Sequence, residues 1–184
     1  MNEPILSELQ ALIEQEVENF SDDLGKTETA VKELMTSLGN GLLKRLVDRG
    51  PNGYKGSSIV CQCGSTMKFV QHRKRNIHTI FGWITVKRAY YHCTNCGKGF
   101  APYDRDSGLG SEQLSPGLAK ACCLLAVGDS FEQVSRRIEA LFGRRVCDDT
   151  VKQLVRNVGA VVLQQQDQDG ECFFDGKQIP HPQG

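Results

Sequence analysis

The 184-residue sequence predicts an α+β fold that is mainly α-helical, with a single β-hairpin between two helical parts. Three observations support this prediction. Apolar residues recur at helical spacing before residue 50 and again after residue 116. The stretch between these parts is rich in aromatic and β-branched residues, which are typical of strands. A cysteine pair lies near each end of that stretch, at 61–63 and at 93–96.

Composition and charge restrict the classes to which the protein can belong. No run of about 18 apolar residues is present, and no basic segment precedes an apolar one at the N-terminus, so the sequence predicts neither a membrane span nor a secretory signal. We therefore expect a cytoplasmic protein whose eight cysteines bind metal or remain reduced. The net charge is zero, but residues 61–103 carry seven Lys or Arg and no acid. This basic block predicts a module that binds an anionic partner.

Residues 1–50 are expected to form a helical arm. One helix is predicted over 4–20 and a second over 27–48, with Thr27 as its cap. The apolar stripe expected on the second helix comprises Val31, Leu34, Met35, Leu38, Leu42, Leu43 and Leu46. We expect this acidic arm to join copies of the chain into a homo-oligomer or to pack on the other modules. A glycine-containing linker follows at 48–58.

Residues 51–105 are expected to form a zinc ribbon. The pairs Cys61–Cys63 and Cys93–Cys96 are each followed by a glycine, which suits the tight turn of a metal-binding knuckle. A hairpin between the pairs returns the second knuckle to the first, so that all four cysteines bind one zinc ion. Four thiolates close the tetrahedron, which predicts a structural rather than a catalytic metal. The alternatives are two turns with unligated thiols or, with less support, a redox C-x-x-C motif.

The segment QHRKRNIH at 71–78 concentrates positive charge at the expected tip of the hairpin. We expect phosphate contacts from this segment and from the following strand, made by Arg73, Lys74, Arg75, Lys87 and Arg88. The alternative is a hairpin tip whose charges are only solvated.

Residues 106–166 are expected to form three helices arranged as a helix-turn-helix. The expected boundary residues are Pro116 in the first helical turn, Ser130 as the cap of the second helix, Gly143 at its end, and Asp148 or Asp149 as the cap of the third. A short turn joins the second and third helices, as in proteins that place the third helix in the major groove of DNA. The alternative is a plain helical bundle with a solvated face.

The third of these helices is the expected reading helix. Its buried stripe is predicted to be Val151, Leu154, Val155 and Val158. That stripe leaves Lys152, Gln153 and Arg156 exposed, where glutamine can read adenine and the cations can read guanine or hold phosphate. Arg144 and Arg145, in the turn before the helix, are expected to contact the DNA backbone.

Three segments of the sequence resemble the N-terminal half of the ISKra-type insertion-sequence transposases. They read FGWITVKRAYYHCTNCGKGFAPYD, GLGSEQLSPGLAKACCLLA and SFEQVSRRIEALFGRRVCDDTVKQLVRNVGA, and the resemblance extends over roughly residues 80–176. It implies a DNA-binding protein, associated with the nucleoid, that recognises the double-stranded ends of its own insertion sequence.

The resemblance also implies that residues 167–184 are the stub of an RNase H-like catalytic domain. Asp175, in a Phe-Asp-Gly motif, matches the first of three acids that bind Mg²⁺ in such a domain. The other two acids would lie beyond residue 184, which predicts a truncated or upstream-frame product. Since two metal ions need several carboxylates, we expect Asp175 to act only within a longer chain and this chain alone not to catalyse.

Two other functions remain open at this point. One is a stand-alone transcription regulator that uses the same zinc ribbon and helix-turn-helix and needs no downstream frame. The other is a protein-interaction module, since zinc ribbons also bind proteins, and such a module would show no salt-dependent binding to DNA.

Overall fold

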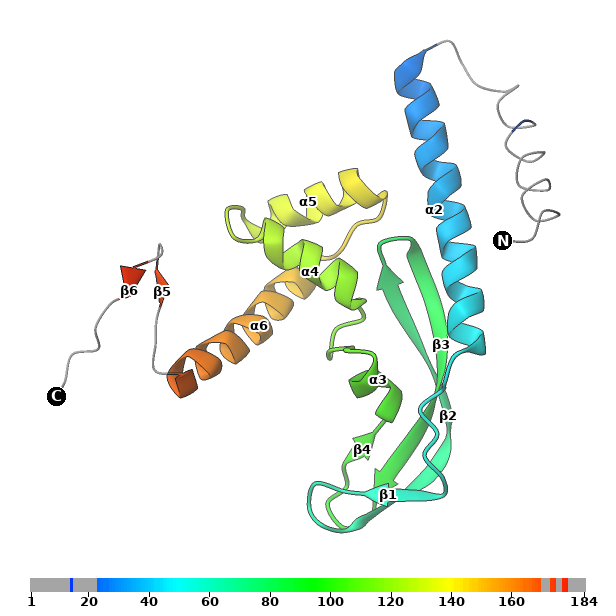
Figure 1. Ribbon diagram of the computed structural model, residues 1–184, viewed down its shortest axis with the longest axis vertical. Coiled ribbons are helices and arrows are strands. Elements are labelled where there is room, and N and C mark those ends of the chain that lie inside the picture. The colour runs from blue at the N-terminus through cyan, green and yellow to red at the C-terminus, as the bar shows by residue number, and fades with distance from the viewer. Residues whose placement is uncertain (1–13, 15–22, 170–172, 175–176, 179–184) are drawn as a thin grey trace.

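The computed structural model describes residues 14, 23–169, 173–174 and 177–178 (Figure 1). The helix expected at 4–20 and the expected catalytic residue Asp175 lie outside the described residues. The elements in chain order are α2 (Leu24–Arg49), β1 (Ser58–Val60), β2 (Thr66–Thr79), β3 (Gly82–Cys93), β4 (Gly99–Phe100), α3 (Pro102–Asp106), α4 (Pro116–Leu125), α5 (Phe131–Phe142), α6 (Asp148–Asp169), β5 (Phe173–Phe174) and β6 (Lys177–Gln178). They confirm a mixed α/β fold, in which β1 to β4 form one antiparallel sheet in chain order.

The long hairpin of β2 and β3 dominates this sheet. Its pairing runs from Met67 opposite Cys93 at one end to Thr79 opposite Gly82 at the other. The hydroxyl of Thr79 closes the turn by donating to the carbonyl of Gly82 over 2.8 Å, and Gly82 has a φ of +114°, which favours glycine. The hairpin was predicted, but the expected place of the basic segment was wrong. Residues 71–78 lie within β2 and not at the tip, because the turn forms just before Gly82.

The hairpin buries opposite faces at its two ends. Near the tip, Ile84 and Val86 pack against Leu43 of α2. Near the cysteines, Ala89 and Tyr91 are buried. They lie an odd number of positions from Ile84 and Val86 along β3, so their side chains point to the opposite face of the hairpin. The face that α2 does not cover is therefore open in the tip half of the hairpin. It carries the exposed residues Lys74, Asn76, Thr85 and Lys87, which we call the open face.

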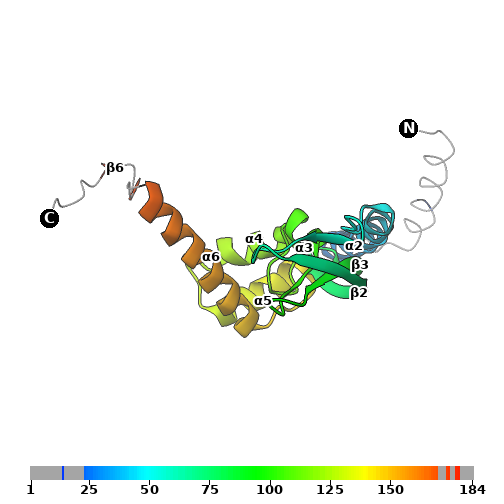
Figure 2. The ribbon, with the colours of Figure 1, turned by 90° about the horizontal axis from the view of Figure 1, so that it is seen from below.

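Helix α2 lies along this hairpin (Figures 1 and 2). The carboxylate of Asp23 caps it by accepting from the backbone N–H groups of Gly25 and Lys26, so the expected cap at Thr27 was wrong by four residues. Most of the predicted apolar stripe is exposed, namely Val31, Met35, Leu38, Leu42 and Leu46. The sheet is contacted from the neighbouring face of the helix, through Leu43 and Val47. The predicted assembly of copies through this arm stays a prediction.

Helices α4, α5 and α6 form a three-helix unit with its own core, built on Leu118, Cys122, Val134, Ile138, Val151 and Leu154. The predicted boundaries of α4 and α5 are confirmed. Ser115 caps α4 just before Pro116, Ser130 forms a capping box with Gln133, and Gly143 ends α5 with a φ of +67°.

The start of α6 differs from the prediction. The helix begins at Asp148, so Asp148 and Asp149 lie in its first turn, where their charges complement the helix dipole, and do not precede it. The residue that precedes the helix is Cys147, and its carbonyl accepts a hydrogen bond from the N–H of Val151. Val158 was expected to be buried but is 42% exposed, because α6 extends beyond α4 and α5 (Figure 1).

Backbone hydrogen bonds join the hairpin to the three-helix unit. His78 of β2 donates its N–H to Gln113 over 2.7 Å and accepts from Ser115 over 2.9 Å, which forms a short parallel bridge to Leu114. Asn157 of α6 donates a side-chain N–H to the Glu112 carboxylate of the same segment. The hairpin and α6 are therefore held in a fixed relation. Within the part of the chain that the structure describes, no helix is long and apolar enough to cross a membrane.

Candidate functional site

The four cysteines predicted to bind zinc lie together at the end of the hairpin opposite its tip. All four Sγ atoms lie within 4.8 Å of one another, with Cys61 to Cys96 at 3.6 Å and Cys63 to Cys93 at 3.7 Å. Four thiolates at the usual Zn–S length stand about 3.8 Å apart at the corners of a tetrahedron. The cluster therefore fits a tetrahedral metal ion such as structural zinc.

Local backbone geometry prepares this cluster. In the first knuckle the N–H of Gly64 bonds to the carbonyl of Cys61 over 3.0 Å, and in the second the N–H of Gly97 bonds to Cys93 over 2.9 Å. Both glycines have positive φ, +81° and +70°. The glycine after each cysteine pair, noted in the sequence, thus allows the turn that brings the two thiols together.

The environment of these thiols favours a thiolate at Cys63. A hydrogen bond from the backbone of Ser65 lowers the pKa of Cys63 to about 6, assisted by the Cys61 thiol and the Asn95 amide. At Cys61 a backbone hydrogen bond at Cys63 lowers the pKa, but burial and the neighbouring thiols outweigh it and raise the pKa to about 12. Thiolates this close together repel one another. A divalent cation would offset this repulsion, because metal binding requires deprotonated thiols.

Two of the arginines predicted to contact phosphate are engaged within the protein. Arg75 and Arg88 each form an ion pair with Asp104, at 2.9 and 3.1 Å. Their side chains are only 12% and 15% exposed. Arg73 is exposed, and its guanidinium lies 3.5 Å from the centre of the Tyr90 ring. The acid that pairs with Arg75 and Arg88 lies just outside the acid-free block, so charge counting within the block could not find it.

The other predicted cations are exposed in two groups. Lys74 and Lys87 lie opposite each other on the open face of the hairpin. Arg144 and Arg145 lie in the turn before α6. Lys152, Gln153 and Arg156 are exposed near the start of α6, as are Asp148 and Asp149 in its first turn. Gln153 donates to the amide oxygen of Asn157 over 3.0 Å, which orients its side chain along the helix.

A groove brings the two groups to one surface. One part, of about 600 Å³, is lined by Trp83 of the hairpin, Arg145 of the turn and Gln153 of α6. A second part, of about 770 Å³, is lined by Lys74, Asn76 and Thr85 of the open face. Ser111 and Gln113 line both parts, so the surface continues from Lys74 to Gln153.

Sequence reasoning missed His78 and Trp83, which lie side by side in this groove. Their rings stack with centroids 4.6 Å apart and an interplanar angle of 11°. His78 is 3% exposed and its Nε2 has no hydrogen-bond partner among the described residues, while Trp83 is 46% exposed. Burial lowers the pKa of His78, as does the positive charge of Arg144. The sequence signal was the short turn at Gly82, which places these two residues opposite each other.

Comparison with known proteins identifies one family. The sequence model of a family described as Uncharacterised protein family (UPF0236) matches residues 62–175, which is more than half of the chain. The match begins inside the first knuckle and includes the hairpin and the three-helix unit. No curated protein matches the chain.

Proposed function

We propose that this chain, which belongs to the Uncharacterised protein family (UPF0236), binds double-stranded DNA as the DNA-binding part of a transposase. The observation that carries the proposal is the continuous surface from Lys74 on the open face to Gln153 on α6. It combines cations that suit phosphates with an exposed helix start that suits base edges.

In this proposal the first two turns of α6 enter the major groove. Lys152, Gln153 and Arg156 read base edges there. Five residues, 143–147, join α5 to α6, a short connection compatible with a helix-turn-helix. Arg144 and Arg145, exposed in this connection, lie where the phosphates flanking the reading helix would pass.

The hairpin contributes a second contact in the same proposal. Lys74 and Lys87 are exposed on the open face and would hold phosphates beside the groove that α6 reads. Arg75 and Arg88 take no part, since both are paired with Asp104 and are largely buried. Zinc is the proposed ion at the four cysteines, where it fixes the far end of the hairpin and has no catalytic role.

The resemblance to ISKra-type transposases supplies the target of the proposal, the ends of the insertion sequence that encodes the chain. Catalysis is proposed only for a form that contains a complete DDE site. There Asp175 would be one of several carboxylates that bind two Mg²⁺ ions.

Binding to labelled duplexes tests this function. The duplexes carry either the DNA that flanks the coding sequence or a scrambled sequence of equal length, and fluorescence anisotropy gives the affinity between 50 and 200 mM salt. We expect tighter binding to the flanking DNA and a log–log salt slope of about −0.9 per phosphate contacted. A protein-interaction module would bind neither duplex. A stand-alone regulator would bind a site at its own promoter and not the outer ends.

A further inference from the structure

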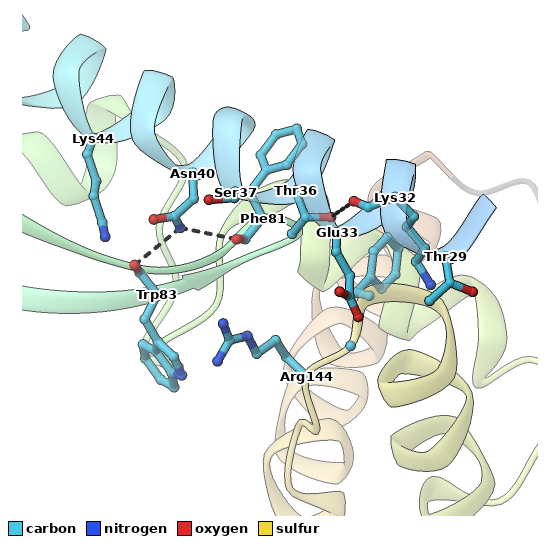
Figure 3. Close-up of a pocket in the computed structure, with 12 residues that line it drawn as sticks. Thr29, Lys32, Glu33, Thr36, Ser37, Asn40, Lys44, Phe81, Trp83 and Arg144 are labelled. Carbon is cyan, nitrogen blue, oxygen red and sulfur yellow. Dashed lines mark hydrogen bonds between the residues drawn. The ribbon is translucent and has the colours of Figure 1, made fainter. Parts of the chain in front are cut away.

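Trp83 also lines a second groove, which shares Arg144 with the proposed DNA surface. This groove lies between α2, the hairpin tip and the turn before α6, and Figure 3 shows its lining side chains. Its volume is about 520 Å³, within the range of sites that hold a small molecule. It combines aromatic, cationic and small polar side chains, the three kinds that recognise a base, a phosphate and a sugar.

The aromatic wall of this groove is held in place. The side-chain amide of Asn40 donates to the backbone carbonyls of Phe81 and Trp83, at 3.1 and 3.3 Å, which fastens the hairpin tip to α2. His78 stacks on the indole of Trp83 and fixes its orientation. Gly39 lets the Phe81 ring lie against α2, since a Cβ at Gly39 would come within 2.6 Å of that ring. A fixed, half-exposed indole is a surface on which a nucleobase stacks.

The charge of the groove suits a phosphate. Figure 3 shows Arg144 reaching toward the indole of Trp83, whereas Lys44 lies on the α2 side of the hairpin and the indole on the other side. Neither Lys44 nor Arg144 has an ion-pair partner among the described residues. Glu33 is the one acid among the described lining residues, and Lys32 donates to the carbonyl of Ala140 over 3.1 Å. The end near Trp83 therefore has one unpaired cation, Arg144, beside the indole.

We infer that this groove binds one unpaired nucleotide of a DNA strand, with its base against Trp83 and its phosphate near Arg144. The inference rests on the proposed function, because Arg144 belongs to the turn before α6 and also lines this groove. A duplex end that has lost one base pair supplies such a nucleotide at little cost in unstacking. A free nucleotide offers the same base and phosphate, so the experiment must separate the two sources.

The fluorescence of Trp83 reports directly on this site, because the chain has one tryptophan. The full chain is titrated with a short single-stranded oligonucleotide, with the same oligonucleotide containing only abasic sites, and with a free deoxynucleoside monophosphate. We expect the oligonucleotide to quench the emission of Trp83. We expect the abasic strand to leave it unchanged and the free nucleotide to act only at much higher concentration. Unchanged emission with saturating oligonucleotide, or equal quenching by the abasic strand, overturns the inference. Quenching by the free nucleotide at equal concentration would show a mononucleotide site and overturn the strand assignment.

Duplexes with and without an unpaired end nucleotide separate this inference from the proposed function. We expect the unpaired nucleotide to tighten binding about fivefold to a hundredfold, the effect of stacking one base. Trp83→Ala should remove this gain and Trp83→Phe should keep most of it, while Tyr54→Ala, an exposed aromatic residue elsewhere, serves as the control. Arg144→Ala provides a second variant that leaves the hairpin unchanged and should also reduce the gain.

The outcomes of the duplex experiment are distinct. Binding of the blunt duplex without any gain from the unpaired nucleotide overturns the inference and leaves the proposed function standing. Failure of the blunt duplex to bind, combined with quenching of Trp83 by the single strand, overturns the proposed function and keeps the groove as a site for unpaired DNA.

Discussion

The guanidinium of Arg75 lies 2.9 Å from the carboxylate of Asp104, between β2 and the short helix α3. The same carboxylate forms an ion pair with Arg88 of β3 at 3.1 Å, and Arg75 also donates to the carbonyls of Gly110 and Glu112, at 2.5 and 2.7 Å. One acid thus ties both strands of the hairpin to the segment that leads into the three-helix unit. These arginines contribute to stability, whereas the exposed lysines of the open face are accessible for the proposed contact with DNA.

Removing Asp104 should therefore destabilise the protein without altering the salt slope of DNA binding. Asp104→Ala leaves two arginines of low exposure unpaired, and we expect a loss of about 1–3 kcal/mol in the free energy of unfolding. Arg105→Ala is the matched control, because it breaks an ion pair with Asp106 at the surface. The side chains of Arg105 and Asp106 are 69% and 41% exposed. Such surface pairs contribute about 0–1 kcal/mol. Urea unfolding measures both changes, and equal losses would contradict the structural role of Asp104.

The buried His78 predicts a dependence of stability on pH. Burial and Arg144 lower its pKa in the folded state, so the unfolded chain binds a proton more readily, near the ordinary pKa of about 6.5. The stabilising contribution is present above that pKa and is lost as the pH falls through it towards the folded pKa. His78→Phe should reduce the loss of stability between pH 7.5 and 5.5. A pH dependence identical in both proteins would show that His78 does not cause it.

The cysteine cluster predicts one zinc ion per chain. Cys93→Ser should release the metal and unfold residues 61–100, because structural zinc sites contribute on the order of 10 kcal/mol of apparent folding energy. Cys147→Ser, at an exposed cysteine outside the cluster, should retain the metal. Elemental analysis gives the metal content and hydrogen exchange locates the unfolding. Freshly purified, reduced protein without zinc would exclude this site as a zinc centre.

The proposed catalytic acid predicts binding without cleavage. The 184-residue chain should bind the ends of its element but leave the strands intact in Mg²⁺ or Mn²⁺, because Asp175 alone does not hold two metal ions. Asp175→Asn should leave the affinity for DNA unchanged. Metal-dependent cleavage that survives Asp175→Asn would remove this residue from any catalytic role.

Local signals in the sequence predicted the cysteine cluster and most of the helix boundaries. The cysteine spacing predicted the cluster, because two short turns determine its geometry. Ser130 and Gly143 also lie where their conformational preferences place them. Two helix starts were missed. Asp23, four residues before Thr27, caps α2, and both Asp148 and Asp149 lie inside the first turn of α6.

The features that depend on distant contacts could not be read from the sequence. The sheet contacts only one face of α2, so most of its apolar stripe is exposed. The pairing of Arg75 and Arg88 with Asp104 requires the chain after the hairpin to turn back onto it. The stacking of His78 on Trp83 depends on the hairpin turn between Thr79 and Gly82, which we predicted too early in the chain, at 71–78.

The sequence preference of Gln153→Ala tests the central claim of DNA reading by α6 most directly. Binding to a library of element-end duplexes, each altered at one base pair, should show that this variant loses about 1–3 kcal/mol of discrimination at one position and keeps the rest. Lys74→Ala should weaken every duplex alike and reduce the salt slope by about 0.9, and Lys98→Ala, an exposed cation near the cysteine cluster, should change neither. If Gln153→Ala weakens every duplex equally, or none of them, α6 does not read DNA through this residue.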